Sequence, residues 1–302
     1  MNNKPINRRQ FIRTGAGLAI SVITVGARKT FAFNANENNS TRWALLADTH
    51  IQAVDDHNHP PEGHYFYNPQ ANLKKVFSEV LAASPQGAII AGDLARLTGE
   101  RGDYNALKKI LSPAAEKIPV YMSLGNHDHR RHYYEAFPDC PGQKQSVRNK
   151  HVIVLEAPPV RLVLLDSLFI VDEAAGLLGR AQRRWLEQYL KDSDNTPTIL
   201  VVHHTLSDND GSLLDVPRLY NIIEPLSKVK AIIYGHSHRH GYSEHEGIHL
   251  INLPAVGYSF RANQPVGWVE VELTTNGGDF TLHVIEGNKE NDGQVKILKW
   301  RT

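Results

Sequence analysis

The chain has 302 residues, of which 41% are hydrophobic, and a formal net charge of +1, which fits one globular domain. Six basic residues and no acidic residue lie in the first 32 positions, so the other 270 residues carry 27 basic and 32 acidic side chains. This mildly acidic remainder gives no evidence of a nucleic-acid-binding surface. The single cysteine, Cys140, excludes an internal disulfide and a cysteine-rich metal site.

The N-terminal segment has the order of a twin-arginine export signal. Arg8 and Arg9 precede the uncharged stretch 14–27, which is shorter than the ~20 apolar residues of a membrane span, and small residues at 30–32 offer a cleavage site. We expect a removable signal at 1–35, recognised by the twin-arginine export machinery, and a mature domain at 36–302. The protein would be periplasmic or secreted, without a stable membrane span. A basic helix belonging to the fold and an uncleaved membrane anchor are the alternatives.

Short apolar strands alternate with amphipathic helices along the first two thirds of the mature chain. Apolar runs predict strands at 43–47, 87–91, 120–124, 198–202 and 231–234, and an antiparallel pair at 152–155 and 161–166 around Pro158-Pro159. Helical spacing predicts helices at 72–83, 104–111, 180–191 and 217–224, the second ending before Pro113. Residues 51–68 read as a long loop. Alternation in the tail predicts a hairpin of 269–273 and 280–285 around Asn276-Gly277-Gly278. Buried strands with external helices indicate an α/β fold.

Five of the predicted strands end in Asp, Asn or His. In α/β folds the carboxyl ends of strands form the ligand-binding rim, so these side chains are expected to meet there. A mixture of carboxylate and amide oxygens with imidazole nitrogens suits borderline divalent metals better than magnesium or calcium. The residues concerned are Asp48, His50, Asp93, Asn126, His203, His236 and His238.

The blocks Asp48-x-His50, Gly92-Asp93, Gly125-Asn126-His127-Asp128, His203 and Gly235-His236-x-His238, in this order, resemble those of the calcineurin-like metallophosphoesterases. Arg130 and the stretch 164–186 are similar to the branch with cyclic-nucleotide and glycerophosphodiester phosphodiesterases. The resemblance implies a four-layer α/β/β/α sandwich of two mixed sheets flanked by helices. It also implies a dinuclear metal-dependent enzyme acting on a small-molecule phosphate ester.

The resemblance also implies a role for each matched residue. Asp48, His50 and His238 would bind one metal ion, Asn126, His203 and His236 the other, and Asp93 would bridge both. His204 is the alternative to His203. His127 and Asp128 would be catalytic, with Asp128 orienting the His127 ring. Asn126 and Arg130 would contact substrate, although Arg130 could equally be a solvated cation that begins a helix.

Two divalent transition-metal ions, with Mn, Fe or Zn favoured, can clamp an in-line displacement and deprotonate a bridging water near neutral pH. The resulting hydroxide would attack a phosphodiester, and His127 would protonate the leaving alkoxide. A phosphomonoesterase using the same site is the alternative, and a non-catalytic metal-binding interaction module is a further one. The loop with His57, His59 and His64 could be a lid, and His240 could line the site. We expect no role for His245, His249, His283 or Cys140.

Overall fold

The computed structural model describes residues 39–54 and 60–302. The chain divides into units 1–32 and 33–302, and every described element belongs to the second unit. The predicted export signal, His57 and His59 lie outside the described residues. Among the described residues, no helix is both long enough and apolar enough to cross a membrane.

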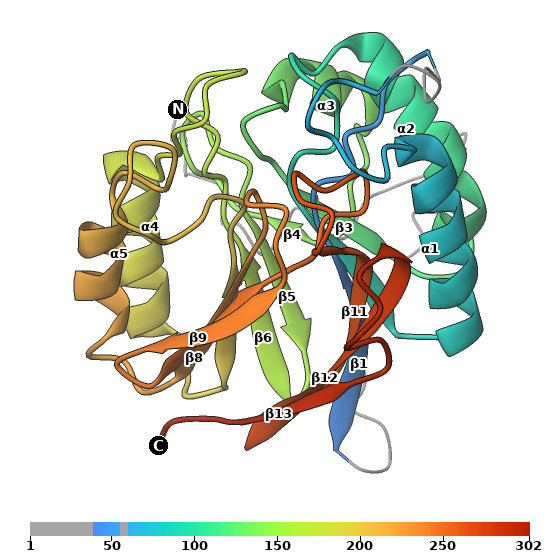
Figure 1. Ribbon diagram of the computed structural model, residues 1–302. Helices are drawn as coiled ribbons and strands as arrows, with labels where there is room; N and C mark the ends of the chain where they lie inside the picture. Colours follow the sequence, from blue (N-terminus) through green and yellow to red (C-terminus); the bar gives the residue numbers. More distant parts are fainter. Residues whose placement is uncertain (1–38, 55–59) are drawn as a thin grey trace, which may run out of the picture. The chain divides into compact units, whose positions relative to one another are not determined.

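Two mixed sheets form the centre of the second unit (Figure 1). The six-stranded sheet has the order β13-β12-β11-β1-β2-β3, and the seven-stranded sheet has the order β4-β5-β6-β7-β8-β10-β9. The strands of the first sheet are β1 (Ser40–Leu46), β2 (Gly87–Ala91), β3 (Val120–Ser123), β11 (Pro265–Thr274), β12 (Gly277–Gly287) and β13 (Val295–Lys299). Those of the second are β4 (Gln143–Lys144), β5 (Ile153–Ala157), β6 (Val160–Leu164), β7 (Thr198–Val201), β8 (Val229–Tyr234), β9 (Gly241–His245) and β10 (Ile248–Asn252).

Alternation within the apolar strands explains how both faces of each sheet are buried. In β1, Trp43 and Leu45 belong to the cluster between the sheets, whereas Ala44 and Leu46 belong to the cluster under the helices. Helices α1 (Pro69–Ala83), α2 (Arg101–Ala115) and α3 (Arg130–Ala136) cover the six-stranded sheet. Helices α4 (Gly179–Asp192) and α5 (Val216–Ile223) cover the other sheet. The predicted four-layer α/β/β/α sandwich is therefore confirmed.

Parallel neighbours direct the polar strand ends toward one edge of the fold. Strands β1, β2 and β3 are parallel, and so are β6, β7 and β8. Asp48, Asp93 and Asn126 therefore follow neighbouring strands of one sheet, whereas His203 and His236 follow neighbouring strands of the other. The loops meet, because the Gly257 N–H donates to the Asp48 carbonyl at 2.9 Å and the Leu253 N–H to the Tyr234 carbonyl at 2.8 Å.

Several predicted boundaries differ from the observed ones. Helix α1 begins at Pro69, not at residue 72, because Pro69 occupies its first turn and the Asn68 side chain accepts the Ala71 N–H. The paired strands around Pro158-Pro159 are present within one or two residues of the predicted bounds, and the two strands of the tail hairpin are longer than predicted. Strands β4, β9, β10 and β13 were not predicted, because they are short, polar or lack clear alternation. Helix α3 was expected only in the alternative interpretation of Arg130, and it begins at that residue.

Helix α2 does not end before Pro113, so that prediction was wrong. The proline lies exposed in the last turn, and its neighbours Leu111 and Ala114 are buried in the cluster under the helices. Burial of these two side chains maintains the helix through the proline, which cannot donate the usual hydrogen bond. The Ser112 hydroxyl donates to the Lys108 carbonyl at 2.7 Å in the same turn.

Replacing Pro113 by alanine should therefore stabilise the protein. The change restores a helical N–H and removes ring crowding, and these gains should exceed the added entropy of the unfolded chain by about 1–2 kcal/mol. Urea unfolding would measure the difference, with Ser112→Ala as the control at an adjacent exposed position. A lower midpoint for Pro113→Ala would show that the proline stabilises this turn.

Candidate metal centre

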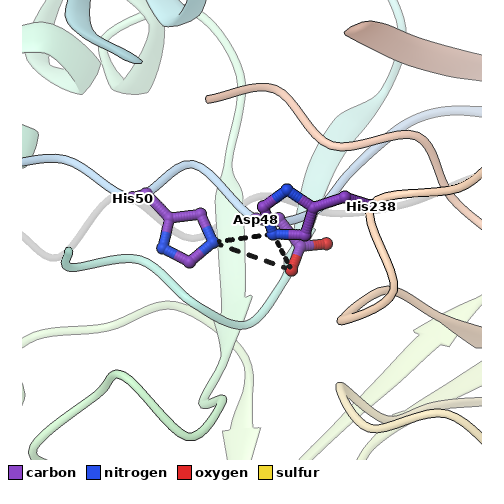
Figure 2. Close-up of side chains that lie close together, drawn as sticks. All are labelled: Asp48, His50 and His238. Atoms are coloured by element: carbon purple, nitrogen blue, oxygen red, sulfur yellow. Dashed lines mark hydrogen bonds and ion pairs between the residues drawn. The ribbon is translucent and has the colours of Figure 1, made fainter. Parts of the chain in front are cut away.

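Six of the seven predicted ligands form two groups, and Asp93 of the second group lies within 4.8 Å of His50 in the first. Asp48, His50 and His238 form the first group, whose ligand atoms lie within 4.8 Å of one another, and Asp93, His203 and His236 form the second under the same limit. Figure 2 shows the first group, with both imidazoles directed toward the Asp48 carboxylate. The Nε2 atoms of His50 and His238 are 3.0 Å apart, and His238 Nε2 is 3.5 Å from Asp48 Oδ1.

Asp93 lies between the two groups. Its Oδ2 atom is 3.7 Å from His50 Nε2 and 3.2 Å from His203 Nε2. The Oδ1 atom of Asn126 is 3.2 Å from the same His203 nitrogen, which is also 3.3 Å from His236 Nδ1. These positions fit the predicted bridging role of Asp93 and bring Asn126 into the second group.

Backbone carbonyls fix which imidazole nitrogen carries a proton. The Nδ1 atoms of His50, His203 and His238 face the carbonyls of Arg96, Ala91 and Tyr258 at 3.3, 2.8 and 2.8 Å. Because a carbonyl only accepts, each neutral ring has its proton on Nδ1 and a lone pair on Nε2. His236 is reversed, since its Nε2 donates to the Gly211 carbonyl at 2.8 Å. When the four rings are neutral, their unprotonated nitrogens therefore face the other acceptors of the two groups.

This donor set fits divalent cations. The Nε2 lone pairs of His50 and His238 cannot hydrogen bond to each other in the neutral rings, although they are 3.0 Å apart. A cation coordinated by both nitrogens and by the neighbouring carboxylate satisfies all three groups. Nitrogen and oxygen ligands without thiolate suit borderline metals, as the sequence predicted.

Burial makes the charges of the centre interdependent. Desolvation raises the pKa of Asp48 to about 7 and lowers the pKa of His50 to about 3. For His203, desolvation is outweighed by the attraction of Asp93 and Asp48, which raises its pKa to about 9. Two buried carboxylates thus require positive charge beside them, which a divalent cation supplies without protonating a ligand.

The ligand backbones are held in an unfavourable conformation. Eleven non-glycine residues of the described chain have positive φ, and five of them are Asp48, His50, Asp93, His236 and His238. This region costs L-residues free energy and persists where the surrounding structure enforces it, often at functional sites.

Two motif glycines permit the close approach of neighbouring loops. A Cβ atom at Gly125 would lie 2.2 Å from Asp93 Oδ1, and one at Gly235 would lie 2.5 Å from Asp48 Oδ2. Any larger residue at these positions would displace a carboxylate of the centre. The glycines that precede Asn126 and His236 are therefore steric requirements of this geometry.

His203 is the histidine of the adjacent pair that joins the centre. The neighbouring His204 is buried and its Nδ1 atom bonds to the Ser167 hydroxyl at 2.7 Å. His240 does not join the centre. Its Nδ1 bonds to the Asn252 carbonyl, and it lines a separate cavity with Tyr242 and Lys296.

The predicted contact between Asp128 and His127 is wrong. Asp128 is fully buried and accepts the N–H groups of Leu94, Ala95 and Gly125 and the Tyr104 hydroxyl, so it stabilises the loops beneath the centre. Desolvation raises its pKa to about 6.

Asp172 contacts His127 instead and was missed by the sequence analysis. His127 Nδ1 lies 2.9 Å from the Leu97 carbonyl and 3.2 Å from Asp172 Oδ1. Asp172 has a φ of 65°, and its N–H donates to the Asn126 carbonyl at 2.8 Å. Asp172 lies 45 residues after His127 in a segment without regular structure, so no local spacing indicates the pair.

The Arg130 side chain is not a free cation, and none of its hydrogen bonds is to a residue of the centre. Its Nε and Nη2 atoms donate to the Asp166 carboxylate at 2.7 and 2.8 Å, and Nη2 also donates to the Leu168 carbonyl. Asp166 is fully buried and needs a counter-charge, which explains this geometry.

The other histidines without predicted roles have local partners. His245 bonds to Glu224, His249 to the Lys299 carbonyl and His283 to Glu270. Cys140 is a free thiol whose pKa is raised by burial. These contacts agree with the expectation that the three histidines and Cys140 lie outside the centre.

The family model for calcineurin-like phosphoesterases matches residues 41–240. The chain is 29% identical to the 3',5'-cyclic adenosine monophosphate phosphodiesterase CpdA of Haemophilus influenzae, over 70% of this chain and 79% of that protein. It is 25% identical to the glycerophosphodiester phosphodiesterase GpdQ of Enterobacter lignolyticus, over 70% of this chain and 76% of that protein.

Solved structures share the fold. A dimetal phosphatase from Danio rerio aligns with a TM-score of 0.67 at 14% identity, over 86% of this chain and 99% of that chain. A purple acid phosphatase from yellow lupin aligns with a TM-score of 0.59 at 14% identity, over 85% of this chain and 53% of that chain. With the matched family model and the converging ligand groups, the chain belongs to the calcineurin-like phosphoesterase family and is a metal-dependent phosphoric ester hydrolase.

Proposed function

We propose that this enzyme hydrolyses phosphodiesters at a centre of two divalent transition-metal ions, with manganese, iron or zinc favoured. The observation that carries the proposal is the convergence of two buried ligand groups on Asp93. One ion would be held by Asp48, His50 and His238, the other by Asn126, His203 and His236, and Asp93 would serve both. When bound, such ions neutralise phosphoryl charge and lower the pKa of water to about 7.

His127 is proposed as the residue that handles the leaving-group proton. Its Nδ1 proton is held by the Leu97 carbonyl and the Asp172 carboxylate, so its Nε2 atom remains to exchange a proton with substrate. The ring lies beside the centre, with its centroid 5.3 Å from that of His50. Asp172 would stabilise the protonated ring, the role that the sequence analysis gave to Asp128.

The charges near the centre favour a diester over a monoester. A diester carries one negative charge, whereas a monoester near neutral pH carries close to two and needs more cationic contacts. The Arg130 guanidinium is committed to Asp166, and Asp172, whose side chain is 48% exposed, adds negative charge beside His127. The names of CpdA and GpdQ, both phosphodiesterases, support the same preference.

We also propose that residues 1–35 are a twin-arginine signal removed on export, which would place the mature enzyme in the periplasm or outside the cell. The support is the order of basic, apolar and small residues in this segment.

Turnover of bis(4-nitrophenyl) phosphate should exceed that of 4-nitrophenyl phosphate in protein supplied with manganese. Metal analysis should find two ions per chain, and chelation should abolish both activities. Asn126→Ala should lower turnover about 10- to 100-fold with unchanged circular dichroism, because one ion loses an oxygen ligand. A strong preference for the monoester would overturn the assignment to diesters.

Asp172→Asn should slow the cleavage of esters with poor leaving groups more than the cleavage of activated esters. We expect about a tenfold loss of kcat with glycerophosphoethanolamine and a smaller loss with bis(4-nitrophenyl) phosphate, whose leaving group needs little protonation. Glu173→Gln, at the adjacent exposed carboxylate, is the matched control. Equal losses on both substrates would contradict a role for Asp172 in proton transfer.

Expression of the complete chain in a bacterium with a functional twin-arginine system should yield a periplasmic protein that begins near residue 33–36. N-terminal sequencing measures the cleavage site, and an Arg8→Lys, Arg9→Lys variant should remain in the cytoplasm. Periplasmic protein with residue 1 still present would instead indicate the uncleaved anchor.

A further inference from the structure

An aromatic surface lies beside one ligand group of the centre. Phe260 is 48% exposed, and its ring centroid lies 4.4 Å from that of His238. Tyr258 is buried, with 6% of its surface exposed, and packs against the same ligand at 4.5 Å and against His50 at 4.9 Å, so it supports the surface from within. His64 completes the surface, at 4.4 Å from Tyr258 and 5.3 Å from Phe260. We call these three residues, His64, Tyr258 and Phe260, the aromatic shelf.

Hydrogen bonds fix the shelf relative to the ligands. The Tyr258 carbonyl accepts the Nδ1 proton of His238 at 2.8 Å, so the backbone of the shelf also orients a ligand. Tyr65 and Ser259 exchange two backbone hydrogen bonds of 2.7 and 2.9 Å, which join the segment carrying His64 to the segment carrying Phe260. A surface held in this way loses little conformational entropy when it binds a ligand.

The side of the centre that carries the second ligand group is polar. Residues 207–212 have the sequence Ser-Asp-Asn-Asp-Gly-Ser, and the Gly211 carbonyl accepts a hydrogen bond from His236. Ser212 is buried and bonds to the hydroxyls of Thr205 and Ser207. The two alcohol groups of a diester bound at the centre would therefore meet unlike surroundings.

We infer that the aromatic shelf, and Phe260 in particular, selects phosphodiesters that carry an aromatic ring on one of their two alcohols. This inference rests on the proposed diester hydrolysis and adds the specificity of the site. The exposed face of Phe260 is apolar and planar. An aromatic group stacked on it gains more binding free energy than the burial of the same apolar area alone would give. The polar second alcohol would be directed toward residues 207–212.

The test compares an aromatic with an aliphatic diester. Phe260→Ala should raise KM for bis(4-nitrophenyl) phosphate about five- to tenfold with little change in kcat, because a stacking contact is lost. KM for glycerophosphoethanolamine should rise less, because neither of its alcohols carries a ring that could stack on Phe260. Phe260→Leu keeps apolar volume without a ring and should give an intermediate KM. Phe66→Ala is the matched control, because this exposed ring lies against Gly287.

Calorimetry with phosphonates measures binding to the aromatic shelf without any catalytic step. Phenylphosphonate should bind the manganese-loaded wild-type enzyme more tightly than methylphosphonate, and Phe260→Ala should remove most of that difference. Equal effects of Phe260→Ala on both substrates and both phosphonates, or the same loss in Phe66→Ala, would overturn the role of the shelf. If the wild type cleaves neither diester, the proposed function fails, and the phosphonate comparison still decides whether the shelf binds aromatic groups.

Discussion

At this centre, imidazole nitrogens that follow strands of two different sheets lie close together, and in the neutral rings they have no proton with which to hydrogen bond to one another. The Nε2 atoms of His50 and His238 meet at 3.0 Å, while backbone carbonyls hold the protons of both rings at Nδ1. In a buried site such an arrangement is unfavourable unless cations satisfy it. The left-handed backbones of five ligands and the lack of a Cβ atom at Gly125 and Gly235 follow from this one requirement. The strained backbones and the glycines cost folding free energy, and they are consistent with a backbone shaped for metal binding.

The fold and the convergence of the candidate ligands could be predicted from sequence because both depend on local signals. A buried strand is a short apolar run, and a ligand at its end is a polar residue in a fixed place, as in Gly92-Asp93 after β2. The parallel arrangement then brings separate strand ends to one edge. The limits of α2 could not be predicted in the same way, since burial of Leu111 and Ala114 outweighs the helix-breaking tendency of Pro113. Short polar elements such as β4 and β9 carry too little pattern to be recognised.

The contacts of Asp128, His127 and Arg130 were much harder to predict than the convergence of the candidate ligands. Asp128 follows His127 directly, yet it turns beneath the centre to bind three backbone N–H groups. Asp172 reaches the same histidine from a distant loop through a positive φ that no local pattern encodes. Arg130 has the charge to bind a phosphate but pairs with the buried Asp166. In each case the contact is made between groups that are distant in sequence or masked from local patterns, because a buried polar group requires a counter-charge or a hydrogen bond.

The same distinction applies to specificity. The candidate ligands lie within residues 41–240, which the family model matches, whereas Tyr258 and Phe260 of the aromatic shelf lie after that range. The shelf is built on two loops that are joined by backbone hydrogen bonds between Tyr65 and Ser259. Loops tolerate sequence change better than buried strands. Enzymes that share the same metal centre can therefore differ in the alcohol groups of the phosphate esters that they bind. Phe260 packs against His238 yet keeps about half of its surface exposed, so part of its ring is available to contact a substrate. A substrate ring seated beside the metal would bury that surface only while the ester is bound, so the free energy gained contributes to substrate selection and leaves the stability of the free enzyme unchanged.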